Sequence, residues 1–381
     1  MPAQLVVDTT VMSYNKEGIG RYVASLLENF SLEVASKTLL VTLNEQVLPE
    51  SILKKGFREK NIVVPGGRFV GLRTARAVVK VAREEDNALL LNTHSHLVAW
   101  LYTNTAWLVH DISPVVHPEF FGLQDNKAKG FAFNFLFGAA MHKARYILTT
   151  TKFVKDEIIA KYNVNSEKVW VIGAGMSDDI EINANEKKTL SKFTLEKYRL
   201  SENNYFLAIG TLSPRKNYSL LLKAYADYLV ADESAAAKLV IVGKKGWLYD
   251  EIFETYNSLK SQLQDKVVFT EYVSDAELIV LLESCKAYVN PSLYEGLGLP
   301  LLAAVKAKKP MIVSNIPPFK ELTSGLAEFF NPQSEAELVA RLKTAPEKGK
   351  APYTAAQAEA VLLQYSWPAV VSRLIDLLKL T

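Results

Sequence analysis

The sequence contains a single cysteine and no long apolar run. Cys285 has no second cysteine to pair with, which excludes a disulfide-stapled secreted domain. The most apolar stretch, FAFNFLFGAAM at residues 131–141, is far shorter than the roughly 20 residues of a membrane-spanning helix. The first residues, MPAQLVVDTT, enter an apolar pattern without the charged region or cleavage site of a signal peptide. We therefore expect a cytoplasmic protein.

The sequence also lacks a large excess of charge of one sign. Its 44 lysines and arginines nearly balance its 41 acidic residues, which gives a formal net charge of +3. The basic residues form no arm or long tract of the kind that binds DNA or RNA. We expect no nucleic-acid partner.

Two chemical motifs are missing. There is no Asp-x-Asp pair to hold a Mg²⁺ ion, so no metal site is expected. Gly18 and Gly20 lie between a strand pattern and a helical pattern, where a backbone loop can receive a phosphate. However, Val23 and Ala24 stand where the third glycine of Gly-x-Gly-x-x-Gly would be, which disfavours an NAD site and leaves a plain tight turn equally open.

The 381 residues, 49% hydrophobic and 22% charged, are typical of a globular protein and are more than one hydrophobic core usually serves. Short runs rich in β-branched residues alternate with helical patterns, which predicts parallel sheets in two α/β domains. A polar segment at 176–204 without a strand pattern separates the halves. The predicted strands are 4–10, 37–43, 61–65, 88–94, 106–111 and 144–151, then 205–211, 238–243, 266–272, 285–292 and 309–315.

Two strand ends in the second half carry candidate site residues, since parallel sheets bind ligands at the carboxyl ends of their strands. After Gly210 and Thr211, Arg215 and Lys216 stand near the start of a helix. The helix dipole favours acids rather than cations at that place, so a bound anion such as a diphosphate explains the pair better than a solvated surface does.

The second of these strand ends is followed by LYEGLGLPLLA at 293–303. Pro300 suits the first position of a helix, and the N–H groups of the glycine-rich turn before it can bind a phosphate. We expect Glu295 to face away from that phosphate and to accept hydrogen bonds from a polyol. An acidic helix cap is the alternative, but Asp, Asn and Ser are the usual caps.

Six segments, in this order, resemble the family 4 retaining glycosyltransferases of the GT-B fold: GIGRYV, VHDISPVVHPEFF, GTLSPRKN, GKKGWLYDEI, FTEYVSDAEL and PSLYEGLGLPLLAA. The match runs along nearly the whole chain and is weakest over 30–90 and in the linker. It implies an α/β GT-B fold, with two Rossmann-like doubly wound domains facing each other across a deep cleft. Residues 1–178 would form the acceptor-side domain and 179–366 the nucleotide-sugar domain, with a last helix at 367–381 packing back on the first.

The resemblance implies transfer of a hexose from a GDP- or UDP-linked sugar to a glycan or lipid-linked acceptor in polysaccharide biosynthesis. The anomeric configuration would be retained, and no metal or other cofactor would be needed. The implied catalytic residues are His110 and Glu295. The implied donor-binding residues are Gly18, Gly20, Gly210, Thr211, Arg215, Lys216, Tyr272, Val273, Gly296, Leu297, Gly298 and Leu299.

Other functions stay open at this point. The same fold could serve an epimerase or a phosphorylase, and a glycosyltransferase-like partner subunit could bind nucleotide sugar or glycan with little catalysis. His94 and His96 have the spacing of a metal pair on an extended chain, but no third ligand is evident, so we expect them in a loop that lines the acceptor pocket.

The sequence departs from the family at Ala303. There the resembling enzymes carry a second acid, eight residues after the first, which holds the ribose of the donor. An alanine methyl cannot accept a hydrogen bond, so we expect weaker donor binding but a working transferase.

Residues 54–83 contain nine lysines or arginines and one glutamate, with apolar residues partly at helical spacing. Such a face can dock on anionic lipid or bind the phosphate of an acceptor, and a solvated basic helix explains it equally well. Peripheral contact with the inner face of a membrane is therefore an expectation that this segment leaves open.

Overall fold

The structure is a computed structural model of the chain. It describes residues 3–14, 18–65, 71–123, 127–176, 184–231, 237–346 and 349–380. The chain divides into two compact units. The first unit consists of Met1–Val116, Leu123–Ser177 and Tyr365–Thr381, and the second of His117–Gly122 and Asp178–Gln364.

The first unit contains a seven-stranded sheet in the order β3-β2-β1-β4-β5-β6-β7, with every neighbouring pair parallel. Its strands are β1 (Leu5–Asp8), β2 (Thr38–Leu43), β3 (Arg58–Ile62), β4 (Leu89–Asn92), β5 (Thr105–Val109), β6 (Tyr146–Thr149) and β7 (Val169–Val171). Its helices are α1 (Ile19–Glu28), α2 (Leu32–Ser36), α3 (Glu50–Leu53), α4 (Leu72–Glu84), α5 (His96–Leu101), α6 (Ser113–Val116), α7 (Lys127–Lys143), α8 (Lys152–Tyr162) and α18 (Trp367–Leu378).

The second unit contains a six-stranded sheet in the order β10-β9-β8-β11-β12-β13, again parallel throughout. Its strands are β8 (Tyr205–Ile209), β9 (Lys238–Val242), β10 (Val267–Glu271), β11 (Ala287–Asn290), β12 (Met311–Ser314) and β13 (Glu328–Phe330). Its helices are α9 (Ala184–Lys197), α10 (Tyr218–Ala231), α11 (Asp250–Ser258), α12 (Ser261–Gln264), α13 (Asp275–Ser284), α14 (Leu299–Lys306), α15 (Pro317–Thr323), α16 (Glu335–Thr344) and α17 (Ala355–Gln364).

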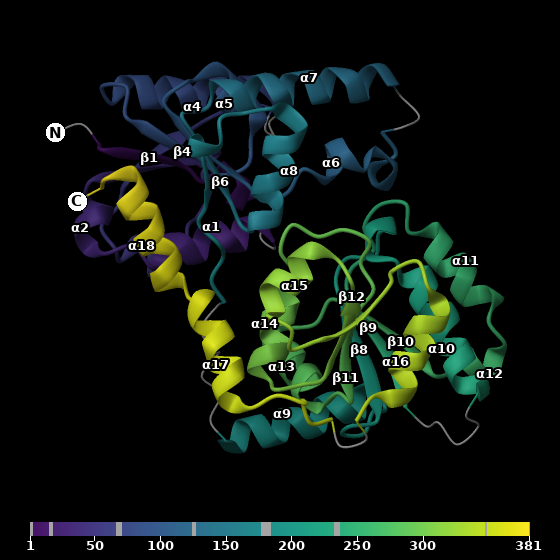
Figure 1. Cartoon of the computed structure of the whole chain (residues 1–381). Coiled ribbons are helices and arrows are strands. Elements are labelled where there is room, and N and C mark those ends of the chain that lie inside the picture. The colour runs from purple at the N-terminus through teal and green to yellow at the C-terminus, as the bar shows by residue number, and fades with distance from the viewer. Residues whose placement is uncertain are drawn as a thin grey trace. The chain divides into compact units, whose positions relative to one another are not determined.

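The central strands β1, β2, β5 and β11 are buried along their whole length, because helices cover both faces of each sheet (Figure 1). The predicted pair of doubly wound parallel sheets is confirmed. In both sheets the strand order reverses next to the first strand, between β1 and β4 and between β8 and β11. Such switch points are where this architecture builds ligand sites.

Three edge elements differ from the prediction. β3 begins at Arg58, three residues before the predicted 61–65, and its exposed charged residues pair with β2 through the backbone alone. The short strands β7 and β13 were not predicted, since three residues give too little pattern to detect. The polar linker contains α9, which packs on α13.

Segments far apart in sequence meet in each unit. In the first unit α18 contacts α1, and the rings of Trp367 and Tyr22 lie 4.9 Å apart, edge to face. Arg373 Nε donates to Ile172 O at 2.9 Å. The chain therefore returns to the first unit after α17; the predicted boundaries, after 178 and 366, differ from the observed division by one and two residues. In addition, residues 117–122 group with the second unit, where Trp247 Nε1 donates to Phe120 O at 2.5 Å.

Gly175 tests the packing of α18. A Cβ at this position would lie 2.4 Å from Trp367 Cγ and 2.6 Å from the Trp367 backbone nitrogen. We expect Gly175→Ala to lower the free energy of opening of α18 by about 1–3 kcal/mol, the usual cost of overpacking, measured by hydrogen exchange of α18 amides. Gly71→Ala, where the added methyl meets nothing within 4 Å, is the control. Equal exchange in the two variants would contradict the packing described.

Candidate active site

The ends of β8 and β11 lie side by side at the switch point of the second sheet. After β8 come Gly210, Thr211 and a 3₁₀ turn at Pro214–Lys216, and after β11 a loop leads to Glu295 and then to α14. The Leu293 N–H donates to Arg215 O at 2.9 Å and ties the two loops together. Because the two strands are adjacent, Arg215 and Glu295 lie close together although they are 80 positions apart in sequence.

Glu295 lies between two cations at this edge. Its Oε1 accepts from Lys216 Nζ at 2.5 Å and from Ser292 Oγ at 2.9 Å, and its Oε2 accepts from Arg215 Nη1. The side chains of Glu295, Lys216 and Arg215 are only 8%, 10% and 17% exposed. With one negative and two positive charges, the network carries a net charge of +1, held by charge-assisted hydrogen bonds.

The charges set the pKa values in this network. Burial alone would raise the pKa of Glu295, but Arg215 and Lys216 outweigh it and lower the pKa from 4.5 to about 2. Burial lowers the pKa of Lys216, and Glu295 partly offsets this. The lowered pKa of Glu295 favours a charged pair, whereas the lowered pKa of Lys216 favours a neutral amine. We take all three groups as charged at neutral pH, because one carboxylate accepts hydrogen bonds from both cations.

The contact of Glu295 with both cations was not predicted from the sequence. Arg215 and Lys216 belong to the 3₁₀ turn, and Asn217, in the left-handed conformation with φ 55°, separates them from α10. Their side chains consequently meet the loop after β11. Because this contact joins two different strand ends, the local helix-dipole argument could not anticipate it.

Two glycines make room for this arrangement. A Cβ on Gly210 would lie 2.7 Å from Lys216 Cε and 3.0 Å from its Nζ, and the φ of +147° disfavours any other residue. A Cβ on Gly298, which has φ +104°, would lie 2.7 Å from the ring of Phe319. Gly210 therefore lets Lys216 cross the end of β8, and Gly298 lets the chain turn into α14.

Backbone donors lie at the start of α14. Among the described residues, the N–H groups of Leu297, Gly298 and Leu299 have no hydrogen-bond partner, and Pro300 follows at the second helical position. This helix start has no acidic residue in its first turn. Together with the two cations of the same unit, it has the chemistry of an anion site.

Tyr272 and Val273 follow β10 in the same unit. The Tyr272 ring is 62% exposed, with Lys244 Nζ 4.6 Å from its centre, while Val273 is buried. Thr211 is exposed beside β8. Ala303 is half-buried on α14. An exposed ring with a cation on it can stack on a planar base.

The first unit places His110 directly after β5. Its Nε2 is buried without a partner among the described residues, and its ring lies 4.9 Å from that of Tyr22. Burial is the largest effect on its pKa and lowers it to about 4, so the imidazole is neutral at pH 7. Gly18, with φ 57°, caps α1 and Gly20 is buried in its first turn; residues 15–17 of the preceding loop lie outside the described residues.

Asp8 and His94 flank the switch point of the first sheet, at the ends of β1 and β4. Asp8 Oδ1 accepts from the N–H and hydroxyl of Thr10 at 3.0 and 2.7 Å. Its Oδ2 is buried 4.0 Å from His94 Nδ1 and has no hydrogen-bond partner in the described part of the chain. Thr93 Oγ1 donates to Asp8 O at 2.8 Å and lies 3.1 Å from His94 Nδ1. Because the Thr93 hydroxyl proton is already donated, Thr93 must accept from His94 Nδ1–H. His94 Nε2 is then a buried acceptor with no partner among the described residues.

These positions were only partly anticipated from the sequence. His96 packs against Phe133 at 5.1 Å between ring centres, so it does not share a site with His94. Asp8 was missed, although an acid at the carboxyl end of a buried strand is a usable signal. Among the described residues no group of three or more His, Cys, Asp or Glu side chains could hold a metal ion.

Residues 192–358 match the family model for glycosyl transferases group 1. The chain is 31% identical over 265 residues to O-antigen chain mannosyltransferase RfbU of Salmonella typhimurium, covering 70% of this chain and 67% of that protein. It is 28% identical over 242 residues to O-antigen chain mannosyltransferase B of Escherichia coli, covering 63% and 62%.

The fold is similar to that of a solved structure, Anabaena Alr3699/HepE in complex with UDP and glucose. The TM-score is 0.74 at 15% identity, and the match covers 98% of this chain and 99% of that one. At this identity the likeness shows the fold alone, and it confirms the expected GT-B architecture.

The Glu295 network predicts an acid-sensitive contribution to stability. Because the pKa of Glu295 is depressed in the folded chain, its contribution is present above pH 4.5 and is lost as the pH falls toward about 2. We expect thermal unfolding from about pH 6 to 2 to show that Glu295→Gln removes up to about 3 kcal/mol of this dependence. Glu254→Gln, an exposed substitution on α11, should keep the wild-type slope. Parallel curves for Glu295→Gln and the wild type would refute the charged network.

Proposed function

Because the chain belongs to the group 1 glycosyl transferases, we propose that it moves a hexose, mannose first among the candidates, from a GDP- or UDP-linked donor to a growing polysaccharide or lipid-linked glycan. The names of its relatives support mannose and an O-antigen type of product. The proposal rests on one observation: Arg215 and Lys216 both form ion pairs with Glu295. The same unit contains the N–H groups at the start of α14 that have no partner among the described residues.

The donor diphosphate is the anion that this part of the second unit suits. Arg215, Lys216 and the N–H groups at 297–299 supply positive charge and donors, and Glu295 already keeps both cations in place. When the diphosphate binds, it shares the cations with Glu295, which is then free to accept hydroxyl hydrogens of the sugar as well. Tyr272, Val273 and Thr211 would receive the base, and Gly18 and Gly20 would adjoin the phosphates.

The first unit supplies hydrogen-bond acceptors that suit sugar hydroxyls. Asp8 Oδ2, His94 Nε2 and His110 Nε2 are all buried and have no partner within the described ranges. The hydrogen bonds of Thr93 leave His94 Nε2 without a proton. We assign His110 to the donor sugar, and Asp8 and His94 to the acceptor. The histidines are neutral at pH 7, since burial lowers both pKa values.

We propose a retaining, metal-independent reaction. The acceptor oxygen bonds to the anomeric carbon on the face that the leaving diphosphate vacates, the bond from that carbon to the phosphate oxygen breaks, and the acceptor's proton passes to that phosphate oxygen. Arg215, Lys216 and the start of α14 stabilise the charge on the leaving group. Glu295, already ion-paired twice, positions the sugar rather than attacking it.

Peripheral contact with an anionic membrane also forms part of the proposal. None of the described helices has the length and apolarity needed to cross a membrane. Helices α4, α5 and α7 form one layer on the first sheet (Figure 1). In this layer α7 exposes Phe131 and Phe135, 73% and 66% accessible, and α4 exposes a basic stripe of Arg73, Arg76, Lys80 and Arg83. A basic stripe with exposed rings suits anionic phospholipid head groups.

Loss of Lys216 tests the donor site. We expect Lys216→Ala to weaken binding of GDP or UDP by about 1.5–3 kcal/mol, roughly 10- to 150-fold, because a charged hydrogen bond is lost and Glu295 keeps one cation fewer. Calorimetric titration with both nucleotides measures this, and Lys223→Ala, exposed on α10, is the matched control. Unchanged affinity in Lys216→Ala would refute the assignment. Nucleotide binding without transfer to any acceptor would instead favour a partner subunit.

The exposed rings of α7 test the membrane contact. We expect the double variant Phe131→Ser/Phe135→Ser to lose most binding to vesicles that contain about one third anionic lipid, because the buried apolar area disappears. Co-sedimentation measures the bound fraction. Phe193→Ser, which removes a ring of 60% exposure on α9, should bind like the wild type. Equal loss in both variants, or no vesicle binding by the wild type, would exclude this face.

A further inference from the structure

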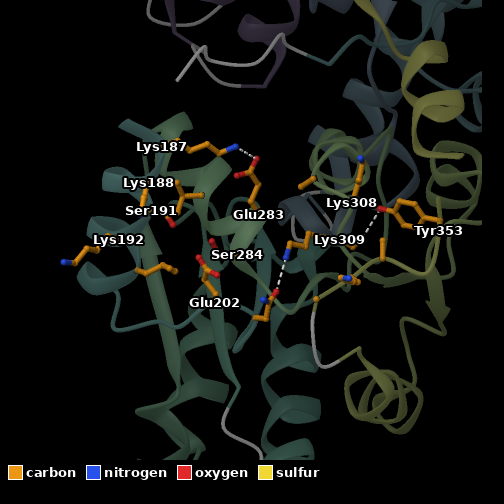
Figure 2. Close-up of a pocket in the computed structure, with 17 residues that line it drawn as sticks. Lys187, Lys188, Ser191, Lys192, Glu202, Glu283, Ser284, Lys308, Lys309 and Tyr353 are labelled. Atoms are coloured by element: carbon orange, nitrogen blue, oxygen red, sulfur yellow. Dashed lines mark hydrogen bonds and ion pairs between the residues drawn. The ribbon is translucent and has the colours of Figure 1, made fainter. Parts of the chain in front are cut away.

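A pocket of about 890 Å³ lies in the second unit, away from the candidate donor site. Its walls are α9, the end of α13, the turn before β12 and the segment 349–353 (Figure 2). Asn203, Ser284 and Lys309 precede β8, β11 and β12, so the pocket lies at the amino ends of these strands. Arg215, Lys216 and Glu295 follow the carboxyl ends, and the length of β8, about 15 Å, separates the two places.

Lysines dominate the lining. Six of them, Lys187, Lys188, Lys192, Lys308, Lys309 and Lys350, stand against two acids, Glu202 and Glu283. Lys187 is paired with Glu283 at 2.8 Å, and Lys192 lies 3.9 Å from Glu196. In the part of the chain that the structure describes, Lys188, Lys308, Lys309 and Lys350 form no ion pair. The pocket therefore has a net excess of positive charge.

Lys309 is the most buried of these cations. The residue is 7% exposed, and its Nζ donates to one acceptor, Asn203 Oδ1, at 3.2 Å (Figure 2). An ammonium has three N–H donors, so two remain without an acceptor among the residues that the structure describes. Burial lowers the pKa of Lys309, because the lost hydration is not fully compensated. A buried cation in this state is stabilised by an anion that enters the pocket.

The backbone around Lys309 is fixed by close contacts. Tyr353 Oη donates to Lys309 O at 3.0 Å, and the Ala351 N–H donates to Lys308 O at 3.3 Å. At Gly349, φ +57°, a Cβ would lie 2.2 Å from Asn203 Oδ1 and 3.1 Å from Lys309 Nζ. Only a glycine lets this segment approach the Asn203–Lys309 pair so closely, so the buried amine has a defined position.

We propose that this pocket binds a small phosphate-bearing molecule, with a phosphate group on Lys309 Nζ and with Lys188, Lys308 and Lys350 neutralising the remaining charge. The volume is that of a ligand of nucleotide or sugar-phosphate size, not of a macromolecule. The lining cations are all lysines, which bind phosphate as point charges, and there is no arginine to grip a planar carboxylate in two places. The ligand would occupy a second site in the donor-binding unit.

Inorganic pyrophosphate is the probe, titrated calorimetrically into the full chain. Because it can also enter the donor site, the titration uses Lys216→Ala as background. We expect this background to keep one pyrophosphate site and Lys309→Met, an uncharged side chain of similar length, to weaken that site about tenfold or more. Lys192→Met is the matched control, since that lysine points away from the others (Figure 2), and its effect should stay within about twofold.

One further variant and one further ligand keep the outcome decisive. The exposed pair Lys308→Met/Lys350→Met leaves the interior untouched and should weaken pyrophosphate by about three- to tenfold. Malonate, a dicarboxylate, should bind much more weakly than pyrophosphate. Full affinity in Lys309→Met, an equal loss in Lys192→Met, or equal binding of malonate would overturn the proposal. The proposal does not depend on the transferase assignment. Nucleotide binding by Lys216→Ala tests the donor site, whereas pyrophosphate binding by Lys309→Met tests this pocket, so either one can fail without the other.

Discussion

A buried carboxylate held between two cations is the interaction on which the candidate donor site depends. Glu295 joins the loop after β11 to the turn after β8. Lys216 can reach Glu295 because Gly210 has no Cβ in its path. Removing Glu295 would leave two largely buried cations uncompensated, which costs far more than a surface ion pair contributes. The network therefore keeps cations in a dry position before any ligand arrives, and preorganised charge of this kind is what transfer of a phosphate-linked group requires.

Most of the strands could be predicted from the sequence, but the contacts between residues at the ends of different strands could not. Buried strands such as β1 and β11, with β-branched cores and polar ends, were predicted because their pattern is local. The edge strand β3 begins three residues before the predicted strand, because its first four residues are exposed and give no apolar pattern. Arg215, Lys216 and Glu295 were each identified as site residues. Their mutual contact was not, since it depends on strand order. Asp8 was missed although its place at the carboxyl end of a buried strand can be seen in the sequence; the structure adds that its Oδ2 has no hydrogen-bond partner among the described residues.

The two units offer opposite hydrogen-bonding chemistry. The switch point of the first sheet presents acceptors, in Asp8 and His94, whereas that of the second presents cations and backbone N–H groups. Acceptors suit hydroxyls and donors suit phosphates, which is the arrangement that the proposed transfer of a sugar from a nucleotide requires. The lysine pocket repeats the phosphate chemistry at the other end of the second sheet, around a single buried amine.

In the proposed mechanism, Arg215, Lys216 and the start of α14 neutralise the donor diphosphate without a metal ion. Calorimetric titration of the chain with GDP and UDP, in excess EDTA and again with Mg²⁺ or Mn²⁺, tests it most directly. The account predicts that the favoured nucleotide binds equally well in EDTA, with an affinity that falls as salt rises. Binding that disappears in EDTA and returns with the metal would contradict it.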